Sequence, residues 1–161
     1  MTRTTARLWA ATLVRVALGG VWVAAGAAKI PDPAASVRAV RAYQVLPEAS
    51  VTAVGYGLPF LEITVGVLLI AGLGTRVVAI ASSVLLVTFI AGVSSAWARG
   101  LTIDCGCFGG GGQVSAAQTA YPQELARDAV LLVASLALAW MPASRLALDT
   151  HTLATRVGEP P

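Results

Sequence analysis

VTAVGYGLPFLEITVGVLLIAGLG at residues 51–74 and VVAIASSVLLVTFIAGVSSAWA at residues 77–98 decide the fold. The first stretch carries one charged residue, Glu62, and the second carries none. Each is longer than the roughly 20 residues that a helix needs to cross the apolar core of a bilayer. Because backbone groups in that core must be satisfied within the protein, both stretches are predicted to be membrane-spanning helices.

Two further apolar stretches flank this pair. Residues 8–28 carry one charge, Arg15, whereas residues 129–144 carry none but are short. The last stretch reaches spanning length only if its helix begins near Glu124. We therefore predict an all-α membrane protein, a four-transmembrane-helix bundle, in one domain over residues 1–161. Its spans are expected near 8–28, 51–74, 77–98 and 124–142.

Two of these spans have an alternative interpretation. The last one is also compatible with a buried or interfacial helix, because of its length. The first resembles a signal peptide, since Arg3 and Arg7 precede the apolar run and Ala25-Gly26-Ala27 resembles a cleavage site.

The composition supports a membrane location. Of the 161 residues, 57% are hydrophobic and 12% are charged, whereas soluble domains carry about 25% charged residues. The mean hydropathy is +0.76. Intrinsic disorder and a disulfide-stapled small domain are excluded. The net charge of +3 is small and its basic residues are scattered, so the lipid bilayer, not nucleic acid, is the expected partner.

The basic residues divide equally between the two sides and do not fix the orientation. Arg3 and Arg7, ahead of the first span, favour a cytoplasmic N-terminus. We predict a multi-pass protein of the cell membrane with both termini in the cytoplasm. Two segments, about 29–50 and about 99–123, then face outward. The first is predicted to hold a short interfacial helix that begins at Asp32-Pro33 and stops at Pro47.

The second outer segment contains Asp104-Cys105-Gly106-Cys107-Phe108-Gly109, with both cysteines of the chain. A disulfide across a single residue closes a tight, strained ring. It stabilises a fold little, because the entropic gain grows with loop length. Strain raises the reduction potential, so this spacing favours a redox role for Cys105 and Cys107. A static disulfide and two inert free thiols remain alternatives.

A metal site within one chain is not expected. Zinc takes four ligands, usually Cys or His, and the single histidine, His151, lies in the C-terminal tail. Iron–sulfur clusters take about four cysteines. A site shared between two chains of a homo-oligomer remains open.

Arg15 and Glu62 are the charges inside the spans. Counted along antiparallel helices, their depths nearly match, which predicts a buried Arg15–Glu62 ion pair. The alternative is that Glu62 handles protons or contacts a quinone near the middle of the bundle.

The chain resembles the MauE/DoxX group of small four-helix membrane proteins, and the MauE family within it. The resemblance extends over roughly residues 8–142. It is carried by an ordered set of motifs: Ala25-Gly26-Ala27-Ala28-Lys29-Ile30, Asp32-Pro33, Tyr43, Leu46-Pro47, Pro59-Phe60-Leu61-Glu62, Gly66 and Asp104-Cys105-Gly106-Cys107-Phe108-Gly109.

This resemblance implies a role in making or maintaining disulfides of an extracytoplasmic protein such as methylamine dehydrogenase, beside a thioredoxin-like partner. It implies that Cys105 and Cys107 are the exchanging pair. Lys29 and Glu62 match the family pattern. DoxX relatives are tied to membrane redox complexes and in some cases to quinones, which makes a quinone the expected cofactor.

The hypothesis from sequence is a membrane component of an extracytoplasmic thiol–disulfide redox system, which would make the chain a component of a thiol–disulfide oxidoreductase. Arg99 would favour a thiolate at the cysteines and Asp104 would oppose it. Two other classes stay open. One is a non-catalytic membrane scaffold for a redox enzyme. The other is a small transporter subunit, suggested by Arg15 and Glu62.

Overall fold

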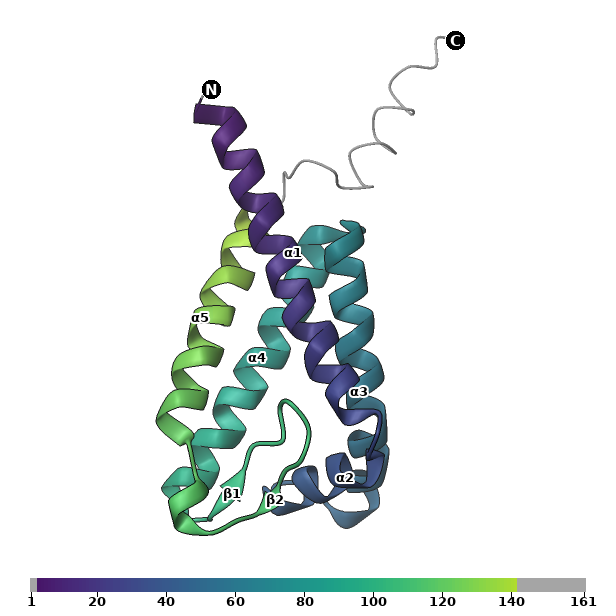
Figure 1. The fold of residues 1–161 in the computed structure, drawn as a ribbon, viewed down its shortest axis with the longest axis vertical. Helices are drawn as coiled ribbons and strands as arrows, with labels where there is room; N and C mark the ends of the chain where they lie inside the picture. The colour runs from purple at the N-terminus through teal and green to yellow at the C-terminus, as the bar shows by residue number, and fades with distance from the viewer. Residues whose placement is uncertain (1–2, 142–161) are drawn as a thin grey trace.

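The computed structural model describes residues 3–141 and consists mainly of helices (Figure 1). The helices are α1 (Arg3–Lys29), α2 (Pro33–Ala42), α3 (Glu48–Ala71), α4 (Thr75–Ala98) and α5 (Tyr121–Trp140). Between α4 and α5 lie two short antiparallel strands and one 3₁₀ turn: β1 (Ile103–Asp104), β2 (Gly112–Gln113) and Ala116–Gln118. The predicted all-α membrane fold is confirmed, because α1, α3 and α4 are long and apolar enough to cross a bilayer.

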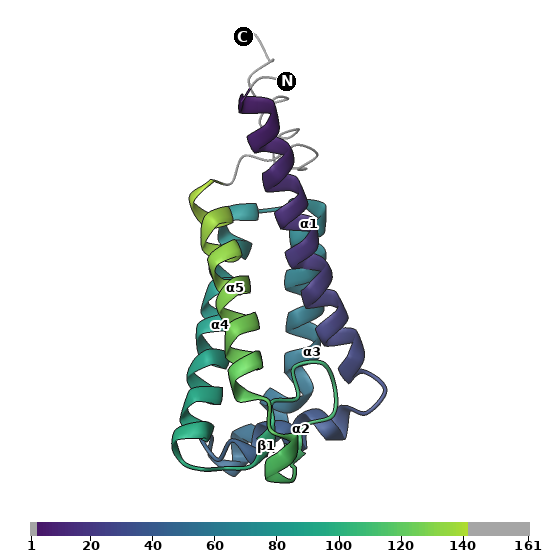
Figure 2. The same ribbon diagram turned by 60° about the vertical axis from the view of Figure 1, so that its left-hand side comes forward.

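The fourth predicted span corresponds to α5, which lies alongside α4 in both ribbon views (Figures 1 and 2). Its first two turns carry Glu124, Arg127 and Asp128. These charges lower its hydropathy, and it is not among the three helices of spanning character. The count of four spans therefore stays a prediction, and His151 lies outside the described residues.

The second predicted span ends earlier than its apolar sequence does. Helix α3 stops at Ala71 because Gly72 adopts a left-handed conformation with φ of 70°. Its N–H donates to the carbonyl groups of Leu68 and Leu69, which caps the helix.

The helices form two pairs, α1 with α3 and α4 with α5 (Figures 1 and 2). The start of α1 and the end of α5 lie at one end of the bundle, and α2 and the strands lie at the other. A buried hydrogen bond of 2.8 Å from Trp22 Nε1 to Ser82 Oγ joins α1 to α4. The main core cluster fills the space around this bond: Leu18, Trp22, Val65, Leu69, Val78, Ala79, Leu86, Leu138 and Ala139.

Glycines set the register of α1 against α3. A Cβ on Gly66 would lie 2.6 Å from the carbonyl oxygen of Gly19, and a Cβ on Gly26 would lie 2.6 Å from that of Pro59. Small residues let helix backbones approach this closely in membranes. Gly19 is therefore opposite Gly66, and Gly26 is opposite Pro59.

This register shows that the predicted Arg15–Glu62 ion pair is wrong. Arg15 Nη1 donates to the carbonyl oxygens of Leu69 at 2.8 Å and Ile70 at 3.1 Å, at the end of α3. Carbonyls in the last turn of a helix lack partners within it and attract positive charge. Glu62 lies toward the other end of α1. The depths of Arg15 and Glu62 counted from the sequence do not correspond in space, because α1 extends beyond the neighbouring helices at its N-terminal end (Figure 1).

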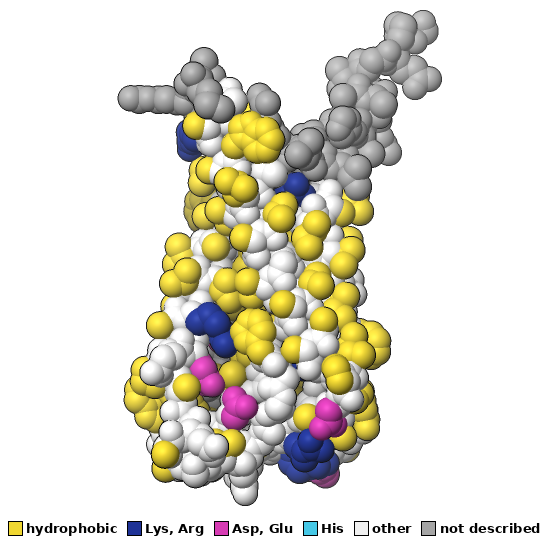
Figure 3. All heavy atoms as spheres, in the orientation of Figure 1, with side chains coloured by type: hydrophobic (Ala, Val, Ile, Leu, Met, Phe, Trp, Pro, Cys, Tyr) yellow, Lys and Arg dark blue, Asp and Glu magenta, His cyan; other side chains and the backbone are white. Residues whose placement is uncertain are grey.

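Large apolar side chains cover the outside of the bundle. Phe60 is 68% exposed, Val77 is 72% exposed and Val130 is 69% exposed. Figure 3 shows hydrophobic side chains along the whole face, with the acidic ones confined to the half that carries α2 and the strands. An apolar exterior of this kind matches a lipid environment.

The predicted short helix that begins at Asp32-Pro33 is confirmed as α2, but it ends at Ala42 and not at Pro47, which instead precedes α3 as its N-cap. The Asp32 side chain accepts a hydrogen bond from the N–H of Ala35, and Pro33 occupies the first turn. Exposed Arg38 and Arg41 form ion pairs with Asp32 and Glu48.

Replacing Gly66 with Ala tests the α1–α3 contact. The added methyl group would meet the backbone of Gly19, which has no room to move, so we expect a loss of about 1–3 kcal/mol. Gly57→Ala is the matched control on the same helix, because nothing lies within 4 Å of its Cβ position. Thermal unfolding in detergent measures both, and equal transition temperatures would contradict the assigned register.

Candidate functional site

The cysteine loop, residues 104–112, lies between the two helix pairs (Figures 1 and 2). The pairing of Asp104 with Gly112 closes it at its base. Gly106 separates the cysteines with φ of 68°, and a Cβ there would lie 2.7 Å from the Cβ of Ala39 on α2. Glycine is therefore required by both backbone conformation and space.

Three long side chains hold the backbone of this loop and of the segment that leads into it. The hydroxyl of Tyr121 donates to the carbonyl of Leu101 at 2.6 Å and accepts from the N–H of Ile103 at 3.1 Å. The hydroxyl of Tyr43 donates to the carbonyl of Cys105 at 3.2 Å. Because Tyr121 begins α5 and Tyr43 directly follows α2 as its C-cap, the position of the cysteines is set by the tertiary structure.

The third side chain is Lys29, at the end of α1. Its Nζ donates to the Cys107 carbonyl at 2.7 Å and to both carboxylate oxygens of Glu62 at 2.6 and 2.7 Å. Lys29 is 4% exposed and Glu62 is 1% exposed. A buried ion pair is tolerable only when each charge is well partnered. The ion pair and the cysteine loop therefore stabilise each other.

The two thiols are free and differ electrostatically. A hydrogen bond from Cys105 lowers the pKa of Cys107, and Arg127 and Lys29 lower it further, while burial and Asp128 oppose them. The same hydrogen bond and burial raise the pKa of Cys105. Cys107 is therefore the sulfur on which negative charge is stabilised.

Arg127 supplies a cation from α5 to this site. Its Nε donates to Asp128 Oδ1 at 2.9 Å, and its guanidinium carbon lies 5.0 Å from the centre of the Phe108 ring. A cation over an aromatic face is attracted to the ring. The contact holds the charge beside the residue that follows Cys107.

Arg99, the basic residue expected from sequence to favour a thiolate, is engaged elsewhere. Its guanidinium donates to the carbonyl oxygens of Ser95 and Tyr43. Sequence reasoning missed Arg127 and Asp128, which lie twenty residues beyond the cysteines, and their charged pattern at the start of an apolar helix was the available signal.

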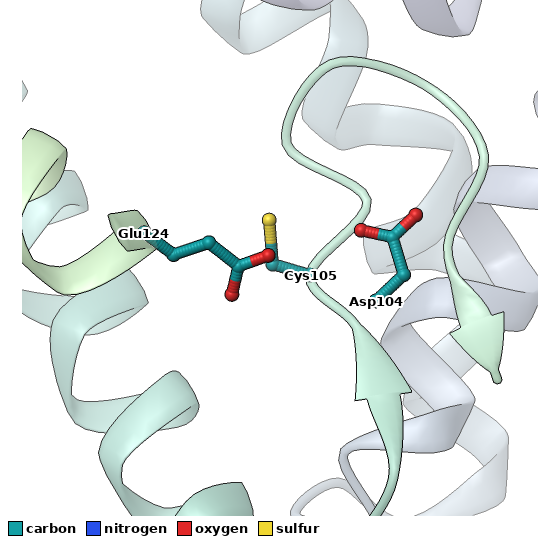
Figure 4. A group of neighbouring side chains, drawn as sticks. All are labelled: Asp104, Cys105 and Glu124. Atoms are coloured by element: carbon teal, nitrogen blue, oxygen red, sulfur yellow. The ribbon is translucent and has the colours of Figure 1, made fainter. Parts of the chain in front are cut away.

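A second group of side chains surrounds the other sulfur. The Glu124 carboxylate reaches from α5 toward Cys105, with Asp104 beside it on the loop (Figure 4). The ligand-type atoms of these three residues lie within 4.8 Å of one another. They fall one short of the four ligands of a structural zinc site. The expectation of no metal within one chain stays a prediction.

Two cavities adjoin the cysteine loop. The larger has a volume of about 290 Å³ and is bordered by both cysteines together with side chains of α2, α3 and α4. The smaller, about 20 Å³, is bordered by Glu62, Cys107, Phe108 and Arg127. The quinone contact predicted for Glu62 stays a prediction. In this structure both carboxylate oxygens of Glu62 accept hydrogen bonds from Lys29.

Replacing Lys29 tests the buried ion pair. Lys29→Met leaves the Glu62 carboxylate buried without a cation, and we expect a loss of roughly 3–5 kcal/mol. Adding Glu62→Leu removes the stranded charge and should restore most of that loss. Arg38→Met is the control, because it breaks an exposed pair that contributes at most about 1 kcal/mol. Thermal unfolding measures the stability of all three variants. If the double variant is as unstable as Lys29→Met, the unpaired Glu62 charge is not the cause of the loss, and the assigned role of the ion pair is contradicted.

The pH dependence of alkylation tests the thiol asymmetry. The single-cysteine variants lose the hydrogen bond between the thiols, so they compare the surrounding charges alone. Cys107 in Cys105→Ser keeps Arg127 and Lys29, which lower its pKa, whereas Cys105 in Cys107→Ser keeps Glu124, which raises its pKa. Cys107 should therefore react at the lower pH. Near neutral pH the rate should differ roughly tenfold per unit of pKa difference. Arg127→Gln in the Cys105→Ser chain should move the Cys107 profile to higher pH. If Cys105 is alkylated at lower pH than Cys107, the assignment of Cys107 as the thiol with the lower pKa is reversed. A small neutral maleimide is the reagent.

Comparison with known proteins assigns the chain to a family. The family model described as methylamine utilisation protein MauE matches residues 7–141. A methylamine utilization protein MauE from Paracoccus denitrificans is 35% identical over 105 residues, which are 65% of this chain and 55% of that protein. The chain thus matches about half the length of this relative, and no solved structure matches it. Because the family model matches nearly the whole chain and the helices have membrane-spanning character, the chain belongs to the MauE family.

Proposed function

We propose that this protein is the membrane component of a thiol–disulfide redox system, and that Cys105 and Cys107 exchange disulfides with a thioredoxin-like partner. The observation that supports this most is the fixed, unequal thiol pair. Cys107 is beside two cations, and both cysteine carbonyls are anchored by side chains from other helices. A stabilised thiolate is the reactive form in such exchange.

The reaction begins with Cys105 and Cys107 joined as a disulfide. A partner thiolate attacks the sulfur of Cys105, and Cys107 departs as a thiolate, because the thiol with the lower pKa leaves faster. A second partner thiol then attacks the mixed disulfide and releases Cys105. The partner loses two electrons and becomes a disulfide, while two protons from its thiols end on Cys105 and Cys107.

The biological setting comes from the relatives. The matching family and the Paracoccus denitrificans protein are both named for methylamine utilisation. We propose that this chain serves the same process by maturing a disulfide-bearing protein such as methylamine dehydrogenase. The loop lies at the opposite end of the bundle from the start of α1 (Figure 1). A cytoplasmic N-terminus would therefore put the cysteines on the extracytoplasmic side.

The transporter hypothesis loses its main support in this structure. It was suggested by charges within the spans. Arg15 is bound to carbonyls of α3 and Glu62 is bound by Lys29. Both charges therefore have structural partners.

Trapping the mixed disulfide tests the exchange. Cys107→Ser retains Cys105 alone, so it should accumulate a mixed disulfide with a purified thioredoxin-fold protein whose resolving cysteine is replaced by Ser. The remaining cysteine of that protein is first converted to its mixed disulfide with 5-thio-2-nitrobenzoate, which departs as a free thiolate when Cys105 attacks. Non-reducing electrophoresis measures the product. The double variant, Cys105→Ser with Cys107→Ser, is the control and should form none.

Sidedness is read by adding the same protein to membrane vesicles of both orientations. The adduct should form only where the extracytoplasmic face is outward. Absence of an adduct with either single-cysteine variant would refute exchange. If cells that carry Cys105→Ser or Cys107→Ser grow on methylamine as well as cells with the unchanged chain, the hypothesis of a non-catalytic membrane scaffold is supported instead.

A further inference from the structure

Three side chains that can ligate a metal ion meet at the cysteine loop. Asp104 and Cys105 belong to the loop, and Glu124 comes from the first turn of α5 (Figure 4). One ligand-type atom of each residue, a thiol sulfur or a carboxylate oxygen, lies within 4.8 Å of the other two. Zinc ligands lie about 2.0–2.3 Å from the ion. The three atoms are therefore spaced as ligands of one ion would be, to within a small side-chain movement.

The Glu124 carboxylate lacks the partner that its burial requires. Glu124 is 8% exposed, and its Oε2 has no hydrogen-bond partner among the described residues. An unpaired carboxylate oxygen in the interior is costly. The side chain extends from α5 toward Cys105 (Figure 4). A cation between Glu124 and the loop would supply the missing partner.

An ion can reach this group from the loop. Asp104 and Cys105 are each partly exposed, whereas Glu124 is buried. The ion would first meet the partly exposed loop side chains and would then draw in the Glu124 carboxylate. Binding therefore does not depend on the small accessible surface of Glu124.

The set of ligand atoms selects the class of ion. Calcium and magnesium take oxygen ligands, and copper(I) prefers sulfur ligands. Zinc accepts cysteine sulfur together with carboxylate oxygen, and its open sites combine three protein ligands with a water molecule. The expectation of no metal within one chain counted cysteine and histidine alone, and Asp104 and Glu124 were outside that count.

We propose that the reduced chain binds one zinc ion through Cys105, Glu124 and Asp104, with water in the fourth position. A thiol that coordinates zinc is deprotonated. Binding therefore forms the zinc–sulfur bond and releases the Cys105 proton to water, and no electron is transferred. The Cys105–Cys107 disulfide has no thiolate to offer, so only the reduced chain binds the ion.

Zinc at this site inhibits the proposed exchange, and this consequence rests on the proposed function. While zinc coordinates its thiolate, Cys105 cannot form a disulfide with Cys107 or with the partner. The ion therefore holds the pair in its reduced form and stops turnover. The difference between the two thiols on which the exchange depends is that of the metal-free chain.

The test titrates Zn²⁺ into the full, reduced chain in lipid nanodiscs, in competition with a chromophoric zinc chelator. One ion should bind per chain, and the chain oxidised to the Cys105–Cys107 disulfide should bind none. Co²⁺ is the second probe, because a cobalt–thiolate bond absorbs light by charge transfer. This absorption should appear only in chains that retain Cys105.

Substitutions identify the ligands. Glu124→Gln and Asp104→Asn should each lower the zinc affinity at least about tenfold, since losing even a group that only hydrogen-bonds to a ligand costs that much. Cys105→Ser should lose the site, whereas Cys107→Ser should retain it. Glu48→Gln is the matched control, because it removes an exposed carboxylate outside the group. Thermal unfolding without metal checks that each variant is folded, and zinc should stabilise the reduced, unchanged chain.

Protection from alkylation gives an independent readout. In Cys107→Ser, saturating Zn²⁺ should block the reaction of Cys105 with the neutral maleimide, because the coordinated thiolate is no longer free. In Cys105→Ser, the reaction of Cys107 should be unchanged by Zn²⁺. The mixed disulfide trapped through Cys105 should likewise form only after a chelator removes the zinc.

The outcomes separate the metal site from the exchange. If exchange proceeds but the reduced chain binds no zinc, the metal site is refuted and the exchange stands. If zinc binds through the assigned ligands but no mixed disulfide forms without metal, the exchange is refuted and the metal site stands. If zinc is lost in Cys107→Ser but retained in Glu124→Gln and Asp104→Asn, the two thiols alone hold it, and the assigned site is refuted.

Discussion

The ion pair between Lys29 and Glu62 ties the cysteine loop to the bundle. Lys29 stands at the last residue of α1 and Glu62 in the middle of α3, and the remaining hydrogen bond of Lys29 goes to the carbonyl of Cys107. Neither charge is tolerable without the other in an apolar interior. The register of α1 on α3, which glycine contacts set, determines whether they meet. Helix packing therefore controls where the cysteines lie.

The same arrangement makes the two sulfurs unequal. Lys29 and Arg127 bring positive charge to Cys107, while Cys105 lies beside Glu124 and Asp104. A pair of thiols in a uniform environment would offer no preferred leaving group. In the proposed exchange, the cations lower the pKa of Cys107 and favour it as the leaving sulfur, and the partner attacks Cys105. The direction of attack in the proposed exchange follows from this difference in charge.

The two helix pairs diverge toward the end of the bundle that carries the cysteine loop. The cysteine loop lies between the pairs at one end of the bundle (Figures 1 and 2). A cavity bordered by side chains of α2, α3 and α4 adjoins it there. A bundle packed evenly along its length would bury the loop or exclude it. The loop therefore lies at the end of the bundle, and its cysteines also border the cavity.

The sequence by itself determined the spanning character of three helices and the short helix after Asp32, and it singled out the cysteine loop as the candidate site. These depend on local properties: apolar length, a capping Asp followed by Pro, and glycines flanking two cysteines. Only the tertiary structure decided which charges meet. Arg15 and Glu62 matched in counted depth, yet the offset of α1 gave Arg15 to the end of α3 and Glu62 to Lys29. Arg127 and Asp128 came to lie beside Cys107 for the same reason, because contacts between distant segments depend on helix register, which no local pattern specifies.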